Sequence, residues 1–173
     1  MKGNRQWIVT IFILTFILAI IFSAVSNCIA AVFNEVALAI ILISVIVLGI
    51  MFDCIGVSVI TANEATFHSM SSKKIKGAKE TITLIKNSSK ISTICNDVIG
   101  DVCGIISGGL GAVLAISLST TTGINNTVIS VIISSLISSM TVGGKAIFKS
   151  IAISNADRII FVVGKIKHFL KIK

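Results

Sequence analysis

Apolar residues form long, unbroken runs along much of this sequence. Residues 7–33 contain no charged side chain, and further apolar runs occupy about 36–60, 93–118 and 127–142. A run of about 18 or more such residues is long enough to cross a bilayer as a helix. Since lipid offers the backbone no hydrogen-bond partner, each run is expected to be helical. The pattern predicts an all-α membrane protein with four transmembrane helices in a single domain, 1–173.

Two polar stretches separate or follow these runs and predict a different kind of helix. Residues 64–90 are rich in lysine, while Ile75, Ala78, Ile82 and Ile85 recur in them at helical spacing. Residues 155–173 alternate apolar pairs with Lys and His. Both patterns are typical of basic amphipathic helices that lie at the cytoplasmic surface of a bilayer with their lysines facing anionic lipid.

The N-terminal run leaves one alternative open. Met1 to Gln6 form a short basic segment of the kind that begins a cleaved signal peptide. The apolar run after it is longer than the roughly 7–15 residues of a signal-peptide core. A membrane span is therefore the favoured interpretation, with cleavage as the alternative.

The placement of charge along the 173 residues predicts the topology. Of the residues, 54% are hydrophobic, and the net charge is +8. Lysine and arginine lie near the N-terminus, between 73 and 90, and from 145 onward, whereas the connections near Asn34 and near Ser119 to Asn126 contain none. The positive-inside rule then places both termini and the middle loop in the cytoplasm. This alternation predicts an integral protein of the plasma membrane, with the lipid bilayer and not nucleic acid as the partner of the basic residues.

Three aspartates lie inside the predicted spans, where a central Asp costs about 2.5–3.5 kcal/mol. Asp97 and Asp101 fall on one face of a regular helix, and glycines at positions 104, 108 and 111 continue that face. Small residues let a neighbouring helix approach closely. The carboxylates are therefore expected to point into a contact between helices or a water-lined cavity. Asp53 is expected to lie on the surface of the second span that faces them.

Oxygen donors on these two spans predict a site for a hard divalent cation. Magnesium prefers six oxygen ligands and usually keeps several waters. The candidate metal ligands are Asp53, Ser58, Thr61, Asn63, Asn96, Asp97 and Asp101. The alternative is that the aspartates form structural ion pairs with lysines such as Lys90. Glu64 and His68 leave a similar choice between a metal or proton site and a surface ion pair.

Several stretches resemble the transmembrane domain of the CNNM/CorC (cyclin-M, CorB) magnesium and cobalt transporter family. The stretch TANEATFHSM places Thr61 and Glu64 where that family has a Ser-x-x-Glu-x-Ala motif. The segment from Gly144 to Lys149 corresponds to the family's Gly-Glu-x-x-Pro-Lys motif, with Lys145 in place of the glutamate and Phe148 in place of the proline. The resemblance covers about 37–173.

The resemblance implies a homodimeric transporter of Mg²⁺ or Co²⁺ with a polar cation pocket open to the cytoplasm. The matching stretch does not include the family's cytoplasmic nucleotide-binding CBS domains, so no ATP-dependent regulation is expected in this chain. The altered motif leaves a non-transporting membrane scaffold or partner-binding protein of the same fold as the alternative. The sequence contains no nucleophile elbow, phosphate loop or paired histidine motif, and we do not expect an enzyme.

Overall fold

The protein is helical throughout the part of the chain that the structure describes. The computed structural model describes the backbone of residues 2–170, and the side chains of these residues except 2–8, 10, 11, 14, 15, 30 and 31. Helices and short turns account for this range, which contains no strand and confirms the all-α prediction. In chain order, the elements are α1 (Lys2–Val32), α2 (Glu35–Thr61), α3 (Glu64–Ser72), α4 (Ala78–Lys86), α5 (Ser88–Thr93), the π-helical turn η1 (Ile94–Ile99), α6 (Gly100–Thr122), α7 (Asn126–Ser154) and α8 (Ala156–Phe169).

Three continuous helical segments are long and apolar enough to cross a membrane. They are α2, the run α5–η1–α6 and α7. The predicted first span corresponds to α1. Among the described residues of α1, the apolar stretch is Phe16–Ile29, which is shorter than the three segments above. Many large apolar side chains of α2 and α7 are exposed, for example Ile40 and Ile132 at 61% each. Because a soluble protein rarely exposes so much apolar surface, we conclude that this is a membrane protein.

The helix that contains the fourth predicted span continues beyond the end predicted for that span. The sequence placed its end at Val142, where lysines begin, but α7 continues to Ser154 and contains both Lys145 and Lys149. Lysine is a good helix former, so a charge ends an apolar run without ending the helix. The connection near Ser119 to Asn126 is shorter in the structure, because α6 continues to Thr122 and α7 begins at Asn126, with Gly123 at a left-handed φ of 72° between them.

The chain divides into two compact units. Unit 1 comprises residues 1–48 and 101–141. In it, Leu38, Leu42 and Ile46 form a buried row along α2, and the Glu35 carboxylate at the start of that helix accepts hydrogen bonds from two hydroxyls of α6, Ser117 and Thr121. Small residues allow close contacts, as where Ser26 packs against Gly109. Unit 1 therefore consists of long apolar helices with few polar contacts.

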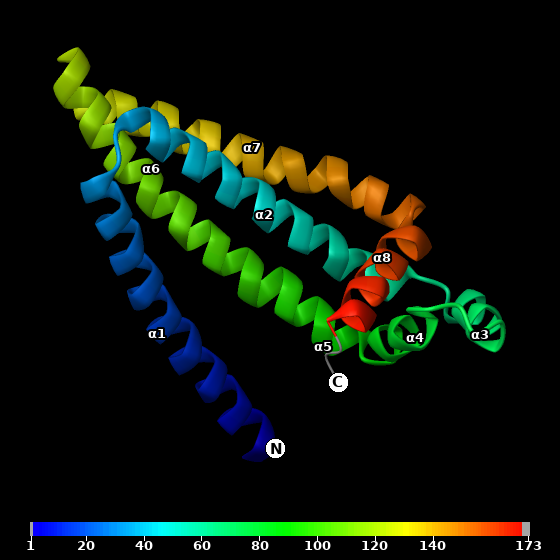
Figure 1. Ribbon diagram of the computed structural model, residues 1–173. Coiled ribbons are helices and arrows are strands. Elements are labelled where there is room, and N and C mark those ends of the chain that lie inside the picture. The colour runs from blue at the N-terminus through cyan, green and yellow to red at the C-terminus, as the bar shows by residue number, and fades with distance from the viewer. Residues whose placement is uncertain (1, 171–173) are drawn as a thin grey trace. The chain divides into compact units, whose positions relative to one another are not determined.

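Unit 2 comprises residues 49–100 and 142–173 and contains all the short helices. Its core is formed by Val59, Phe67, Leu84 and Ile160, which are 0–9% exposed. Helices α4 and α8 are neighbours (Figure 1). They pack closely because Gly164 of α8 leaves room for the buried Thr81 of α4. The predicted amphipathic segment 64–90 is thus divided among α3, α4 and the start of α5. Gly77, with a φ of 90°, forms the joint before α4.

Candidate functional site

Asn96 lies on the π-helical turn η1, which joins α5 to α6. A π-helical turn inserts an extra residue into a helix and occurs frequently at functional sites. The Asn96 amide nitrogen Nδ2 donates to Ser92 Oγ over 3.2 Å. The amide oxygen Oδ1 is buried and accepts no hydrogen bond from any described residue. An unsatisfied buried acceptor costs about 1–3 kcal/mol, so a partner such as a cation or a water would stabilise this oxygen.

Gly56 of α2 makes room for that oxygen. A Cβ atom at position 56 would overlap the Asn96 amide, with Oδ1 as the nearest atom. Gly56 is itself buried. Any side chain at this position would displace Asn96, so the glycine and the asparagine function as a pair. The sequence indicated Asn96 as a candidate ligand by residue type, but the π-helical turn and the contact with Gly56 become visible only in the structure.

Asp53 forms an ion pair with Lys145 within unit 2. The distance from Lys145 Nζ to Asp53 Oδ1 is 3.6 Å, and the two side chains are 33% and 17% exposed. Nζ also lies near Gly100, since a Cβ built there would be 3.7 Å from it. Lys145 thus places a positive charge between α2 and the end of η1. Asp53 thus has the lysine partner that the alternative interpretation requires, with Lys145 in place of Lys90.

Ser58, Thr61 and Asn63 each have a local partner. Ser58 is fully buried, and its hydroxyl donates to the Cys54 carbonyl over 2.8 Å and to the Ala152 carbonyl of α7 over 3.4 Å. The Thr61 hydroxyl donates to the Val57 carbonyl over 2.9 Å. Asn63 caps α3, because its side-chain oxygen accepts from the Ala65 N–H over 3.0 Å. An N-cap of this type is a common structural role for asparagine.

Asp157 of α8 is a polar residue that the sequence did not single out. Its carboxylate accepts from the Asn63 N–H over 2.8 Å and from the Thr66 hydroxyl over 3.3 Å. These bonds join the start of α8 to the start of α3. They account for the position of Asn63 without a metal ion.

The carboxylates do not form a cluster in the part of the chain that the structure describes. Asp97 is exposed on η1 in unit 2, and Asp101 is exposed in unit 1. Within the described residues, no group of three or more His, Cys, Asp or Glu side chains could hold a metal ion. The seven-ligand pocket therefore stays a prediction, and Asn96 is its one member with an unsatisfied buried oxygen.

Glu64 and His68 form the exposed ion pair that was the alternative to a metal site. The His68 Nε2 atom lies 3.0 Å from Glu64 Oε1, and Lys86 Nζ lies 3.9 Å from the same oxygen. His168 forms a similar pair with Glu80, with 2.7 Å between Nδ1 and Oε1. The hydrogen bond from His168 holds the pKa of Glu80 below its usual value. The first pair lies within α3, with Lys86 of α4 beside it, and the second joins α4 to α8.

Comparisons with protein-family models, with curated proteins and with solved structures found no match to this chain. The geometry of the described residues, together with the sequence, is therefore the basis for a functional proposal.

Proposed function

We propose that this membrane protein is a divalent-cation transporter, with Mg²⁺ or Co²⁺ as its substrate and the surroundings of Asn96 as its binding site. One observation carries the proposal. The Asn96 amide oxygen is a hard donor, buried without a hydrogen bond, on a π-helical turn inside an apolar helix. Amide oxygens suit hard divalent cations, and Mg²⁺ usually retains several waters that complete its six ligands. The resemblance to CNNM/CorC transporters points in the same direction.

The proposal includes the topology and assembly expected from the sequence. Four spans, with α1 as the first, place both termini in the cytoplasm of a plasma-membrane protein. Residues 1–6 and the lysines of α4 and α8 then lie on the same side of the bilayer, as the positive-inside rule requires. A homodimer is the assembly that the family resemblance supports.

A flux assay tests transport directly. The full chain is reconstituted into liposomes that contain a Mg²⁺-sensitive dye, and Mg²⁺ is added outside. We expect uptake above that of protein-free liposomes, and a reduction of about tenfold or more in Asn96→Ala, since one lost hydrogen bond or ligand to a charged group costs about 1.5–3 kcal/mol. Gly56→Ala should reduce uptake similarly, because its methyl group displaces the Asn96 amide.

Gly104→Ala is the matched control for the glycine variant. A Cβ at position 104 meets no atom within 4 Å, so uptake should not change. Wild-type uptake equal to that of protein-free liposomes would contradict the proposal. Equal loss in the Gly56 and Gly104 variants would show that the effect is not specific to Asn96.

The alternative is a membrane scaffold that transports nothing, and Lys145 is the observation that favours it. The ammonium group already neutralises Asp53 at 3.6 Å, and it repels a divalent cation nearby. If the protein binds cations, Lys145→Gln should strengthen the Mg²⁺-dependent rise in melting temperature, because Asp53 is released as a ligand. If the protein is a scaffold, Mg²⁺ should have no effect on either protein. Lys145→Gln should then destabilise the fold, and Asp53→Asn in the same chain should restore much of the loss.

A further inference from the structure

The short helices of unit 2 begin where the apolar helices end. Helix α2 ends at Thr61 and α3 begins at Glu64, while α7 ends at Ser154 and α8 begins at Ala156. The third apolar segment begins at Ser88, directly after α4. A helix that follows a membrane span after one or two residues must begin at the membrane surface. Helices α3, α4 and α8 are therefore expected near the phospholipid headgroups.

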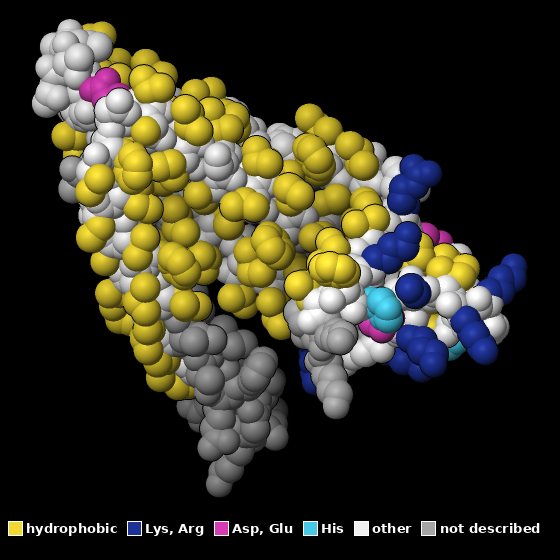
Figure 2. All heavy atoms as spheres, in the orientation of Figure 1, with side chains coloured by type: hydrophobic (Ala, Val, Ile, Leu, Met, Phe, Trp, Pro, Cys, Tyr) yellow, Lys and Arg dark blue, Asp and Glu magenta, His cyan; other side chains and the backbone are white. Residues whose placement is uncertain are grey.

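Positive charge greatly exceeds negative charge on these segments. Residues 62–90 and 155–170 contain nine Lys and Arg residues against Glu64, Glu80 and Asp157. All three carboxylates have partners within unit 2. Of the nine basic side chains, which all lie in the described range, only Lys86 is within 4.0 Å of a carboxylate. Figure 2 shows Lys and Arg side chains gathered over the end of unit 2 that these helices form.

A shallow groove lies within this basic surface. It has a volume of about 560 Å³ and is lined by Lys76, Lys165, Ile166, His168, Phe169 and Leu170. Its apolar side chains are unusually exposed: Phe169 is 87%, Leu170 56% and Ile166 53% exposed. Lys76 comes from the turn before α4, and the other lining residues come from the end of α8. The exposed lining of the groove is entirely apolar, so Lys76 and Lys165 contribute their aliphatic stems to it and their ammonium groups lie outside that lining.

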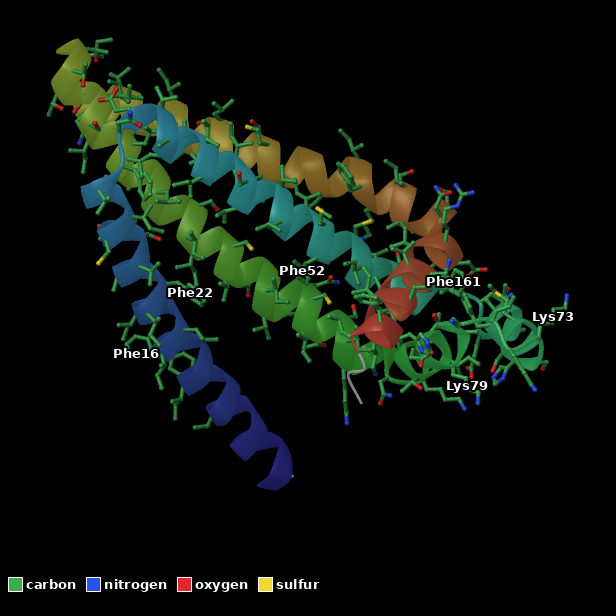
Figure 3. All side chains as sticks on the ribbon, in the orientation of Figure 1. Phe16, Phe22, Phe52, Lys73, Lys79 and Phe161 are labelled. Atoms are coloured by element: carbon green, nitrogen blue, oxygen red, sulfur yellow. The ribbon has the colours of Figure 1, made fainter. Side chains whose placement is uncertain are left out.

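Three contacts fix the positions of two residues that line the groove. The Lys165 ammonium lies 4.5 Å from the centre of the Phe161 ring, and the aliphatic stem of Lys165 packs against Gly77. His168 is held by Glu80 of α4, whose carboxylate lies 2.7 Å from Nδ1. Figure 3 shows Phe161 on α8 and Lys79 on the neighbouring α4. Lys165 and His168 are therefore held in place by contacts within α8, with Gly77 before α4 and with Glu80 of α4.

We propose that this groove binds an anionic phospholipid of the membrane, with its phosphate at Lys76 and Lys165 and its acyl chains along Phe169 and Leu170. Charge complementarity selects an anionic headgroup, since each lysine near the surface strengthens binding to anionic lipid. The exposed apolar side chains select a lipid over a soluble anion, because they cover acyl chain that would otherwise meet water. This binding site is separate from Asn96 and does not depend on transport.

The test uses the purified full chain in neutral detergent and two fluorescent lipids with identical acyl chains, phosphatidylglycerol and phosphatidylcholine. We expect phosphatidylglycerol to bind at least tenfold more tightly. Lys76→Gln with Lys165→Gln should weaken phosphatidylglycerol binding about 25-fold, at about fivefold per lysine, and should leave phosphatidylcholine binding unchanged. Glycerol phosphate at millimolar concentration should not displace the lipid.

Lys73→Gln with Lys79→Gln is the matched control, since both lysines are exposed on the same unit and neither lines the groove. It should weaken binding less than threefold. Lys76→Arg with Lys165→Arg should retain binding, and circular dichroism should show unchanged helix content in every variant. Equal affinity for the two lipids would overturn the proposal, as would an equal loss in the two glutamine variants. Displacement by glycerol phosphate would reassign the groove to a soluble anion.

Discussion

The two units of this protein are stabilised in different ways. In unit 1, long apolar helices meet through small residues, for example Ser26 against Gly109, and much of their apolar surface is exposed. In unit 2, Phe67, Leu84 and Ile160 form a core like that of a soluble domain, and Asp157 and Glu80 join its helices. Because lipid is as apolar as leucine, burying apolar side chains in a bilayer stabilises little, and close packing must hold the helices together. Where a domain is in contact with water, as at the membrane surface, the hydrophobic effect makes the burial of apolar side chains stabilising.

This difference predicts that unit 2 is more sensitive than unit 1 to the loss of a buried side chain. The largest effect is expected for Phe67→Ala, since Phe67 is 1% exposed and packs against Phe161 with ring centres 6.1 Å apart. Truncating such a residue costs about 3–5 kcal/mol. Hydrogen exchange in detergent micelles should show the loss of protection concentrated in α3, α4 and α8.

Phe169→Ala is the control for this prediction. Phe169 is 87% exposed on the same unit, so its truncation should change stability by less than about 0.5 kcal/mol. If Phe67→Ala and Phe169→Ala had equal effects on exchange, the core described for unit 2 would not be what stabilises it.

Glycine contacts give a second, smaller difference between the units. A Cβ at Gly164 of unit 2 would overlap the Thr81 hydroxyl and lie 2.9 Å from the Gly77 carbonyl oxygen, which is backbone and cannot move aside. A Cβ at Gly111 of unit 1 would overlap only the end of the flexible Ile137 side chain and would make an ordinary contact of 3.6 Å with Ile133. Overpacking costs about 1–3 kcal/mol, and we expect Gly164→Ala at the upper end of this range.

Gly111→Ala should cost at most about 1 kcal/mol, because Ile137 can change rotamer and alanine favours the helix. Gly143→Ala is the control, since nothing lies within 4 Å of its Cβ, and it should be neutral or slightly stabilising. Melting temperatures of the three variants in one detergent provide the measurement. A larger drop for Gly111→Ala than for Gly164→Ala would reverse the comparison between the units.

The sequence predicted the helices better than their contacts. Apolar runs indicated α2, α6 and α7, because a bilayer requires long apolar helices. They could not indicate which face of α2 is buried. Apart from Ser44 and Gly49, residues 36–52 are apolar on all sides, so the sequence does not distinguish the buried row at positions 38, 42, 46 and 50.

The candidate site shows the same limit. The residue type alone made Asn96 a candidate ligand. Its buried, unsatisfied oxygen lies on a π-helical turn, and an analysis that assumes regular α-helical spacing cannot predict such a turn. The sequence did not identify Lys145 as the partner of Asp53, because Lys145 follows the apolar run that predicted the fourth span. In the structure, α7 continues through Lys145. Local sequence thus identified the donor types, and the packing of helices determined which of them have partners.

The smallest predicted effect concerns the pair that joins α4 to α8 in unit 2. The hydrogen bond from His168 lowers the pKa of Glu80 from the ordinary value of 4.5, so the ionised carboxylate favours the folded state. This contribution is complete above about pH 4.5 and is lost as the pH falls through the lowered pKa of the folded protein. Since the pair is exposed to water, we expect a small fall in melting temperature between pH 5 and pH 3.

Glu80→Gln should lower the melting temperature slightly at pH 6 and reduce its fall at acid pH. Glu64→Gln is the control, since it removes the carboxylate of another exposed pair and leaves His168 and Glu80 in contact. Hydrogen exchange at the end of α8 distinguishes a local effect from a global one. If the Glu80 and Glu64 variants had the same dependence on pH, the pair would not be what couples α8 to α4, and the close contact between Gly164 and Thr81 would be sufficient.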